Sequence, residues 1–552
     1  MPNSAYNFVF SDNIRSKSGG IFNELRILFT TKNATINLIK ATDGNINFLK
    51  NSIIQNVPLS PKIELEFNKP IDPQSVTSNS IRIINNGTYV NLNFTLKNSN
   101  KTIVITSDKK LTHLSKYLLF IKNSLSGQFG EEFSEFSKTF YSEIDTTPKF
   151  KIISDEQLLT LIQKQTFKYF WDFAHPTSGM TRERYNSQDI VTTGGSGFGV
   201  MALIVGIERG FITREQGLQR LSKILTFLEN ADRFHGVWSH WLNGNSGKVY
   251  PFSLKDDGAD LVETSFLVQG LLTFRQYLNS SVSQENELIA RINSLWNTIE
   301  WNFFTQNENV LYWHWSPKYN FEMNMPIRGH NEALITYILA ASSSNYGIEP
   351  AVYHQGYAIN GNIQNGNNYC DIFLPLGQAY GGPLFFTHYS FLGLDPRNLN
   401  DNYANYWQQN KNHTLINRAY CLKNPKNYID YSVDCWGLTA SDNQKGYSAH
   451  SPTNDLGVIT PSAAISSIVY TSEESLKAIH HFYYILGDRL WGEYGFYDAF
   501  NATENWWADS YLAIDQGPII IMIENYRSGL LWDLFMSCPE IQSGLNKLEF
   551  IY

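Results

Sequence analysis

The chain has 552 residues, which is more than one ordinary domain holds, so we expect two domains or one large helical toroid with an additional domain. Hydrophobic residues make up 42% and charged residues 17% of the sequence, a balance that excludes a long disordered protein. The net charge of -8 disfavours a nucleic-acid partner, and the lack of an apolar run of 18 or more residues predicts that the chain has no membrane span.

Cysteine usage and the N-terminus carry little signal. The four cysteines are too few for a disulfide framework and too scattered for a CxxC metal site, so we expect neither a metal nor another cofactor; they are Cys370, Cys421, Cys435 and Cys538. The start of the sequence, Met1 to Ser4, lacks the basic and then apolar pattern of a signal peptide. The protein is therefore expected to be cytosolic, or to be exported with a leader that this sequence lacks.

Charge and tryptophan content divide the chain near residue 146. Residues 1–146 carry 16 Lys and Arg against 12 Asp and Glu, a net charge of +4, whereas the remainder carries 27 against 39, a net charge of -12. All 13 tryptophans follow this point, the first being Trp171. Such a change in composition predicts two domains, residues 1–146 and 147–552, joined by the linker Asp145 to Pro148.

The first part has the pattern of an all-β domain. Short segments that alternate apolar and polar residues are separated by Asn, Pro, Gly, Ser or Asp, which is typical of an antiparallel sandwich; the predicted strands are 62–67, 80–84, 89–96, 102–106 and 117–121. Residues 1–50 are expected to add further strands. The stretch from Leu59 to Val76, with its turn sequence FNKPIDPQSV, resembles a bacterial Ig-like domain. No residue in this part suggests chemistry.

Helical periodicity begins at Ser154, where the sequence Ser-Asp-Glu-Gln has the pattern of a helix cap. Further amphipathic segments are predicted at 196–209, 214–231, 258–279, 284–304, 330–342, 398–410, 461–469, 473–487 and 517–535. About ten to twelve helices joined by long Gly-, Asn- and aromatic-rich loops indicate an (α/α) barrel, whose active site would lie at the end where the loops gather. A helical repeat array is the alternative, although no fixed-period motif supports it.

Three acidic residues are predicted to lie in one row on a helix. Asp256, Asp260 and Glu263 are spaced i, i+4 and i+7, and the next turn supplies no cation to offset their repulsion. Folding alone would not favour this arrangement, but a site that needs one protonated and one ionised carboxyl group would. The alternative for Asp256 and Asp257 is a solvated first turn, where acids suit the helix dipole. Apolar neighbours make that alternative weaker for Glu263.

A further carboxylate, Glu332, is predicted in the first turn of an apolar helix, beside Arg328 and His330. An aromatic loop that contains Trp313 and Trp315 precedes it. The alternative is an N-terminal helix acid stabilised by the helix dipole. The density of polar groups beside tryptophan favours a functional site.

Aromatic and polar residues also alternate in the segments 237–242 and 383–390. Aromatic faces suit the C–H faces of pyranose rings, while His, Asn and Asp bind sugar hydroxyls. Core packing is the alternative for any single Trp, but the tryptophans at 238, 241, 313, 315, 436, 506 and 507 mostly have polar, loop-like surroundings. The residues predicted to contact a substrate are Trp238, His240, Trp241, Trp313, Arg328, His330, His388, Tyr389, Trp436 and Trp506.

Several ordered motifs in the second part resemble the glycoamylase-like family; they lie at 193–199, 207–215, 257–264, 435–442, 495–501 and 514–530. The resemblance covers roughly residues 155–540. Similar members include β-1,2-glucanases of glycoside hydrolase family 144, which have an (α/α)6 barrel. The expected fold is therefore an N-terminal all-β Ig-like sandwich followed by an all-α (α/α)6 barrel.

The resemblance implies hydrolysis of a neutral, β-1,2-linked glucan or its oligosaccharides by inversion and without a metal. It carries the acidic positions of the family onto Asp256, Asp260, Glu263 and Glu332. Glu332 is expected to be the general acid, and Glu263, with Asp260 supporting it or substituting for it, the base that activates water. Inversion requires carboxyl groups roughly 6.5–9.5 Å apart. His330 stands where relatives are expected to have Tyr or Trp, so the substrate contact there is open.

Other functions were weighed against this one. A glycan-binding protein without activity and a glucoamylase-type α-glucan hydrolase are the alternatives. The DDxxD-like spacing of Asp256, Asp257 and Asp260 also fits a prenyl-diphosphate enzyme, but no basic cluster accompanies it, and the acidic second part also argues against a uronate lyase. Neither a GxSxG motif nor a Cys near a His supports a Ser or Cys hydrolase.

The expected setting is an exported bacterial protein of the periplasm or cell surface, because an Asn-rich, Cys-poor chain combines an Ig-like domain with a hydrolase. We expect a monomer that binds a glucan. Chain length, endo or exo action and the role of the Ig-like domain stay open.

Overall fold

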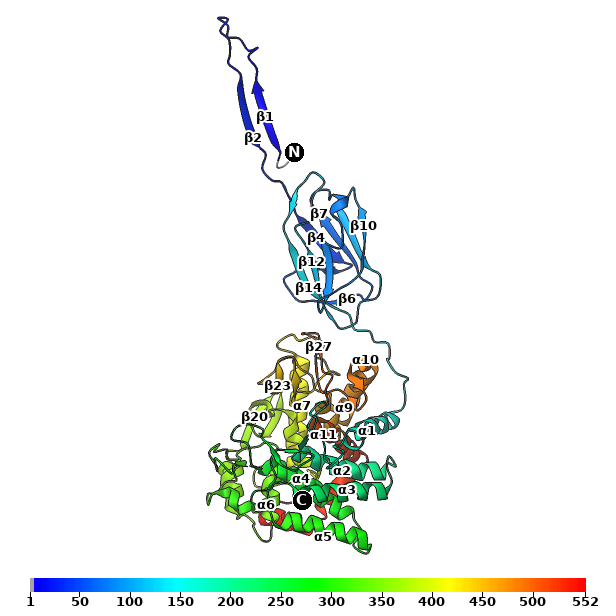
Figure 1. The fold of residues 1–552 in the computed structure, drawn as a ribbon, viewed down its shortest axis with the longest axis vertical. Coiled ribbons are helices and arrows are strands. Elements are labelled where there is room, and N and C mark those ends of the chain that lie inside the picture. The colour runs from blue at the N-terminus through cyan, green and yellow to red at the C-terminus, as the bar shows by residue number, and fades with distance from the viewer. Residues whose placement is uncertain (1–3) are drawn as a thin grey trace. The chain divides into compact units, whose positions relative to one another are not determined.

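The structure is a computed structural model that describes residues 4–552. The chain divides into two compact units, of which the first runs to Thr146 and includes Ala502–Asn505, and the second comprises Thr147–Asn501 and Trp506–Tyr552 (Figure 1). Met1, Pro2 and Asn3, which belong to the segment without a signal pattern, lie outside the described residues. No helix among residues 4–552 is long and apolar enough to cross a membrane.

Two five-stranded sheets form the body of the first unit. One has the order β10 (Leu92–Lys97), β11 (Thr102–Ser107), β7 (Lys62–Phe67), β4 (Leu38–Asp43) and β5 (Ile46–Asn47). The other has the order β6 (Ile54–Val57), β14 (Phe136–Ser142), β12 (Lys116–Ile121), β8 (Ile81–Asn85) and β9 (Thr88–Tyr89). Neighbouring strands are antiparallel except β6 and β14, which are parallel.

Alternation along the strands builds one core between these sheets. In β7 the side chains of Ile63 and Leu65 are buried while the intervening glutamates are not, and Leu119 and Ile121 of β12 are buried in the same cluster. A half-buried strand buries every second residue because successive side chains point to opposite faces. The predicted sandwich is confirmed, and β7 has the predicted bounds.

One predicted strand is wrong as a single element. The segment 89–96 is broken, because β9 ends at Tyr89 and pairs with β8 in one sheet, whereas β10 begins at Leu92 and pairs with β11 in the other. The first residues do add strands: β1 (Ala5–Phe10) and β2 (Leu25–Thr30) form a separate hairpin, and β3 (Thr35–Ile36) pairs with β13 (Glu132–Phe133).

Helices dominate the second unit: α1 (Asp155–Trp171), α2 (Thr193–Glu208), α3 (Arg214–Asn230), α4 (Leu261–Tyr277), α5 (Ser283–Asn297), α6 (Leu334–Ser342), α7 (Tyr406–Lys423), α8 (Pro461–Ser466), α9 (Ser472–His480), α10 (Gly487–Leu490), α11 (Ala513–Ser528), α12 (Leu530–Met536) and α13 (Pro539–Lys547). Helix α2 packs on both α4 and α11, and all three helices are buried on nearly all sides. Helices α3 and α5 expose one face. The unit therefore has inner and outer helices.

Short strand pairs connect these helices: β15 (Ile190–Thr192) with β16 (Trp241–Asn243) and β17 (Val249–Tyr250), β18 (Ala259–Asp260) with β19 (His314–Trp315), β20 (Gln364–Tyr369) with β21 (Ile372–Leu376), β22 (Ala440–Asn443) with β23 (Gly446–Ala449), β24 (Trp491–Gly492) with β25 (Gly495–Phe496), and β26 (Phe500–Asn501) with β27 (Trp506–Trp507). They order the long connections that follow and precede the helices, so that loop side chains are held by backbone pairing.

Local signals explain where several helices begin. The predicted cap at Ser154 is a capping box, because its hydroxyl accepts the Gln157 amide N–H while the Gln157 side chain accepts the Ser154 amide N–H. The prediction for 398–410 is wrong: α7 begins at Tyr406, where the Asn405 side chain caps it, and extends to Lys423. The segment 517–535 is two helices, because Gly529 takes a left-handed backbone (φ 72°) that ends α11.

Helices α2 and α4 approach one another through glycines. A Cβ atom on Gly197 would lie 2.1 Å from the Phe266 carbonyl oxygen, and one on Gly270 would lie 2.2 Å from the Gly197 carbonyl oxygen. Backbone contacts of this kind leave no room for even a methyl group. The two inner helices that carry the site described below are therefore held at a separation that only glycine permits.

Replacement of Gly197 by alanine should destabilise the protein by about 3 kcal/mol or more, because the helices must separate, although alanine is the better helix former. Denaturant unfolding measures the change. The exposed Gln219→Ala on α3 is the control and should shift the free energy of unfolding by about 0.5 kcal/mol or less. Equal stabilities of Gly197→Ala and the wild type would contradict the close-packed crossing.

Candidate active site

A cavity of about 380 Å³ in the second unit contains both predicted glutamates, Glu263 and Glu332. Four of the predicted substrate contacts line it as well: His240, Trp241, Trp313 and Tyr389. Four further aromatic rings line it: Phe252, Phe266, Phe385 and Tyr447. The sequence-based expectation that acids from two separate helix starts share an aromatic-lined cavity is thus met by the geometry.

The Asp260 carboxylate positions several groups around this cavity. One carboxylate oxygen accepts the amide N–H groups of Val262 (3.0 Å) and Glu263 (2.9 Å), which makes Asp260 the N-cap of α4. The other oxygen lies 3.0 Å from His240 Nδ1 and 3.2 Å from the donating Trp313 Nε1. Asp260 is 1% exposed and both of its oxygens are occupied. It positions its neighbours, and the prediction that it could itself serve as the base is not supported.

The predicted helical row of acids is wrong, because α4 begins at Leu261 and only Glu263 lies on it. Residues Ala259–Asp260 are extended and pair with β19, which keeps the preceding segment out of the helix. Asp256 lies before this strand, 2.9 Å from His314 Nε2, and does not line the cavity. Asp257 accepts a hydrogen bond from Ser316, so the two aspartates are held by side-chain partners instead of forming a solvated first turn.

Glu263 is held in its place by the N-terminus of α2. Its Oε2 accepts the Gly194 amide N–H at 2.8 Å and the Thr192 hydroxyl at 3.4 Å. A Cβ atom on Gly194 would lie 2.5 Å from that oxygen, so glycine is needed for the approach. Burial raises the pKa of Glu263, while His240 and the Gly194 amide oppose the rise. The carboxyl group is fixed, with its other oxygen unused by these donors.

Glu332 has a different environment. It lies two residues before α6, which begins at Leu334 instead of near residue 330. Ser390 stabilises this start by accepting the Ile335 amide N–H and donating to the Glu332 carbonyl oxygen. Burial, together with the charges of Glu263 and Asp260, raises the pKa of Glu332 to about 7, although a bond to its own backbone amide opposes the rise. A carboxylic acid in this setting keeps its proton near neutral pH.

His240 lies between Asp260, which it contacts directly, and the charge of Glu263. Burial alone would lower the pKa of its imidazole, but the charge of Glu263 and the hydrogen bond to Asp260 raise that pKa to about 9. The ring also packs against Phe252, at 4.5 Å between centroids, and against Trp241, at 5.6 Å. A cationic His240 stabilises the ionised form of Glu263 beside it.

Several residues that sequence reasoning missed also line the cavity: Glu183, Arg184, Phe252, Phe385 and Tyr447. Arg184 donates to Glu183 at 2.8 Å and to Asp442 at 2.8 Å, so its charge is paired. These five residues lie in short strands, a 3-10 turn and loops outside the α-helices, and only the folded chain brings them together. The sole signal was the aromatic richness of those loops.

A second pair of buried acids lies behind Asp442. Asp498 accepts the Asp442 amide N–H at 2.7 Å, and Asp515 accepts the Ser462 hydroxyl at 2.6 Å. Burial raises the pKa of both, to about 7 for Asp515, and the two carboxyl groups interact directly. Two buried acids that interact in this way titrate as a pair. Neither lines the cavity, so we assign them no contact with a substrate.

Two predicted substrate contacts are wrong because the tryptophans belong to the core. Trp238 and Trp436 are both 0% exposed. The Trp238 indole donates to the Leu228 carbonyl oxygen at 3.2 Å, and Arg233 stacks on its ring. A ring without an exposed face cannot receive a sugar. For these residues the alternative of core packing was the correct one.

Four more predicted contacts do not line the cavity. His388 is buried and hydrogen-bonds Ser467, and half-buried Trp506 lies on β27. Arg328 and His330 line another cavity, of about 330 Å³, with Asn331. Burial lowers the pKa of His330 to about 3, which keeps its imidazole neutral. Sequence proximity to Glu332 was misleading, because the chain turns between these residues.

Two other features bear on what the site could hold. His240, Asp256 and Asp260 present ligand-type atoms within 4.8 Å of one another, but both Asp260 oxygens already accept hydrogen bonds, so the donor set fits a metal poorly.

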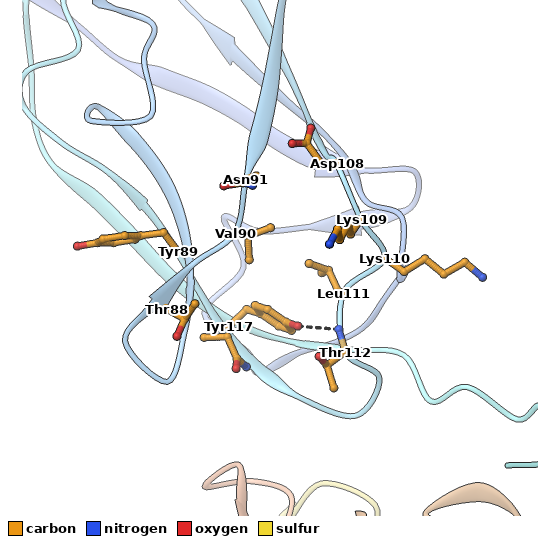
Figure 2. Close-up of a pocket in the computed structure, with 11 residues that line it drawn as sticks. Thr88, Tyr89, Val90, Asn91, Asp108, Lys109, Lys110, Leu111, Thr112 and Tyr117 are labelled. Atoms are coloured by element: carbon orange, nitrogen blue, oxygen red, sulfur yellow. Dashed lines mark hydrogen bonds between the residues drawn. The ribbon is translucent and has the colours of Figure 1, made fainter. Parts of the chain in front are cut away.

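In the first unit, a cavity of about 290 Å³ lies beside Tyr117, whose hydroxyl accepts the Thr112 amide N–H (Figure 2). Its lining offers no acid–base pair.

Comparison with known proteins places these features in a family. A family profile described as putative glucoamylase matches residues 324–539, and one described as bacterial Ig-like domain matches residues 51–141. An exo β-1,2-glucooligosaccharide sophorohydrolase (non-reducing end) of Parabacteroides distasonis is 46% identical over 422 residues, which cover 72% of this chain and 58% of that protein. The chain thus spans somewhat more than half the length of this relative.

Solved structures agree with this result. An endo-β-1,2-glucanase from Chitinophaga pinensis, in complex with sophorotriose and glucose, has a TM-score of 0.72 and 57% identity, covering 73% of this chain and 99% of that chain. A β-1,2-glucanase from Parabacteroides distasonis has a TM-score of 0.70 and 36% identity, covering 97% and 77%. The class of protein is defined by an Ig-like domain that is followed in the chain by a helical unit with a paired-carboxyl cavity. The chain belongs to the glycoamylase-like family, which confirms the resemblance seen in its motifs.

The raised pKa of Glu332 predicts a pH-dependent stability difference between wild type and Glu332→Gln. Below its ordinary value of about 4.5 the carboxyl group is protonated in both folded and unfolded chains, so glutamine should change little. Between about 4.5 and 7 the folded wild type must retain a proton that the unfolded chain loses, and it loses stability as pH rises. The variant avoids this cost. The melting temperature of the variant should therefore rise relative to that of the wild type as pH increases across that range.

Thermal unfolding at a series of pH values measures this difference. The control is Glu287→Gln, which changes an exposed glutamate of α5. A difference in melting temperature between Glu332→Gln and wild type that stays constant from pH 4 to about 8 would show that Glu332 has an ordinary pKa.

Proposed function

We propose that the protein is a glycoside hydrolase that cleaves β-1,2-linked glucan or its oligosaccharides with inversion. One observation carries the proposal: Glu263 and Glu332 line the same aromatic-walled cavity, and burial raises the pKa of both, but Glu263 has the cationic His240 and the Gly194 amide beside it to oppose that rise. Relatives named as β-1,2-glucanases and a sophorohydrolase support the choice of linkage. Inversion is assigned from the family resemblance.

Glu332 acts as the general acid. Its pKa of about 7 keeps a proton available near neutral pH, and it delivers that proton to the glycosidic oxygen as the bond to the anomeric carbon breaks. Glu263 acts as the base, because His240 and the Gly194 amide favour its ionised form. It removes a proton from a water molecule that attacks the anomeric carbon from the opposite face. Asp260 contributes by orienting His240 and Trp313.

The cavity wall favours a neutral sugar. Trp241, Trp313 and Tyr389 present aromatic surface, which stacks on the C–H faces of pyranose rings. The one guanidinium among the described residues that line the cavity, Arg184, is already paired with Glu183 and Asp442. The only other cationic side chain among these lining residues, His240, is engaged by Asp260, so a uronate would find no unpaired cation here. Glucose units can stack on these aromatic rings and carry no charge that the wall would have to neutralise.

The architecture proposed for the catalytic unit is an (α/α)6 barrel with its cavity at the loop end. The inner helices α2, α4 and α11 and the outer helices α3 and α5 support this arrangement. We further propose that the protein works as a monomer in the periplasm or on the cell surface. An Ig-like domain and a polymeric glucan substrate both suit an exported protein. Cell fractionation and light scattering test these two points.

Glu332→Gln and Glu263→Gln should each lower kcat by about 10³-fold or more, because the amide can neither deliver nor remove the proton. The wild-type rate should also decline as pH rises through about 7, where Glu332 loses its proton. Reducing-sugar release from β-1,2-glucan measures both effects. Folding of each variant is checked by its melting temperature, and Glu287→Gln should keep full activity. Near-normal turnover by either variant would remove that residue from the chemistry.

A substrate panel tests the linkage. β-1,2-Glucan or its oligosaccharides should be hydrolysed at least about 10²-fold faster than β-1,3-glucan or starch, since a cavity shaped for one linkage misaligns the others. Product analysis separates endo from exo action: sophorose as the sole early product indicates exo cleavage, and a ladder of oligosaccharides indicates endo cleavage. Preferential release of glucose from starch would overturn the linkage.

A further inference from the structure

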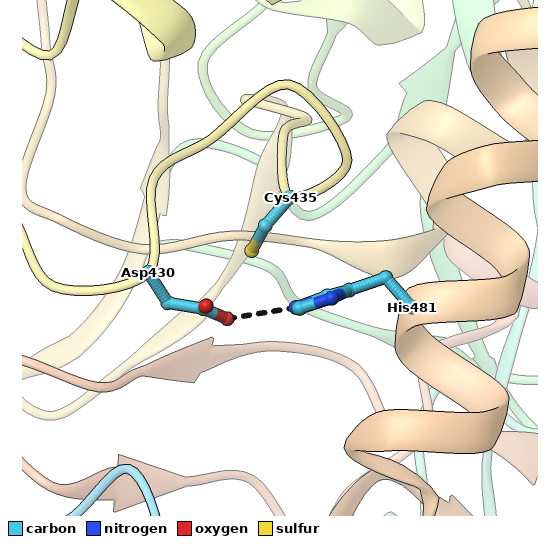
Figure 3. A group of neighbouring side chains, drawn as sticks. All are labelled: Asp430, Cys435 and His481. Carbon is cyan, nitrogen blue, oxygen red and sulfur yellow. Dashed lines mark hydrogen bonds and ion pairs between the residues drawn. The ribbon is translucent and has the colours of Figure 1, made fainter. Parts of the chain in front are cut away.

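Three side chains of metal-ligating type converge in the second unit, and none of them lines the active-site cavity. Asp430 and Cys435 come from one loop, and His481 begins the π-helical segment His481–Ile485 that follows α9; their polar ends point toward one another (Figure 3). One ligand-type atom of each lies within 4.8 Å of the other two. The sequence did not indicate this group, because Cys435 is far along the chain from His481. Only the fold brings the two residues together.

The donor set fits a zinc ion. Zinc takes thiolate, imidazole and carboxylate ligands at about 2.0–2.3 Å, and tetrahedral geometry then separates the ligand atoms by about 3.3–3.8 Å. His481 Nε2 and Asp430 Oδ2 are 2.9 Å apart, so a small rotation of either side chain opens the required space. A thiolate ligand disfavours calcium and magnesium, which select oxygen donors.

The backbone aims these side chains. Ser432 and Cys435 are joined by two hydrogen bonds, from the Ser432 amide to the Cys435 carbonyl oxygen (3.0 Å) and from the Cys435 amide to the Ser432 hydroxyl (3.1 Å). Asp430 has a left-handed backbone (φ 71°), which is uncommon outside glycine. Short π-helical segments such as the one at His481 occur frequently at functional sites. Both contributing segments are therefore irregular at the point where they meet.

A neighbouring cavity offers the metal ion a route to these three side chains and a fourth ligand. His481 and Asp434 line a cavity of about 380 Å³ together with His480 and Tyr484. Asp434 lies close enough to act electrostatically on both Cys435 and His481. The cluster is otherwise shielded, since Cys435 is fully buried and the side chains of His481 and Asp430 are 13% and 8% exposed. The cavity can supply a water molecule to complete four-coordination.

We propose that Asp430, Cys435 and His481 bind one Zn²⁺ ion at a structural site. Binding releases the thiol proton of Cys435 and the proton between His481 and Asp430, so a thiolate and a carboxylate balance the two positive charges of the ion. The chain continues from Cys435 into β22, whose Ala440 lines the active-site cavity and whose Asp442 holds Arg184. The ion ties the loop 430–435 to the end of α9 and so steadies one wall of that cavity.

The experiment uses the full-length protein after treatment with a chelator and dialysis. Added zinc should be retained at about one ion per chain in elemental analysis and should raise the melting temperature by several degrees, whereas magnesium and calcium should do neither. Cobalt(II) serves as the spectroscopic probe, because a cobalt–thiolate bond gives a near-ultraviolet charge-transfer band. These readouts are independent of the activity proposed above.

Variants decide between this site and a metal-free hydrogen-bonded cluster. Cys435→Ser should lose the charge-transfer band, and His481→Gln, whose side chain faces the cavity, should lose zinc retention even if burial makes the first variant unstable. The matched controls are Cys538→Ser, another buried cysteine, and His480→Gln, the adjacent histidine paired with Asp155; both should bind as the wild type does. Failure of the wild type to retain zinc, or equal retention by all variants, overturns the proposal.

Discussion

The carboxylate of Asp260 is the contact on which the arrangement of the cavity depends. With one oxygen it starts α4, which carries Glu263, and with the other it holds His240 and Trp313. A buried carboxylate is costly unless its lone pairs are used, and here four donors use them. The backbone of the inner helix and the side chains of the cavity are therefore set by one group. Any change at Asp260 would disturb fold and site together.

Close approach of backbones is the second requirement. Gly197 and Gly270 let α2 and α4 touch, and Gly194 lets the first turn of α2 donate directly to Glu263. The amide groups at a helix N-terminus favour an anion, so the same contact that packs the helices stabilises the ionised glutamate. The TGGSG sequence at 193–197 thus serves packing and electrostatics at once.

Features that depend on neighbours in the sequence were predicted better than the burial of individual side chains. The capping box at Ser154, the alternation in β7 and the two glutamates followed from local patterns, which depend on neighbours in the sequence. Whether a tryptophan is core or wall depends on contacts between distant segments, so Trp238 and Trp436 could not be separated from Trp241 and Trp313 by their immediate neighbours. The helical row through Asp256 failed for the same reason: pairing of β18 with β19 overrides the helical spacing.

The division of labour between the two glutamates follows from what each one touches. Glu263 is buried against a cationic imidazole, an amide and a hydroxyl, all of which favour a carboxylate. Glu332 is half-buried in a cavity whose wall carries several aromatic rings, and the negative charge of Glu263 adds to the cost of ionising it. Ionisation of the first therefore keeps the second protonated. A single cavity can hold an acid and a base because the charge of one sets the proton affinity of the other.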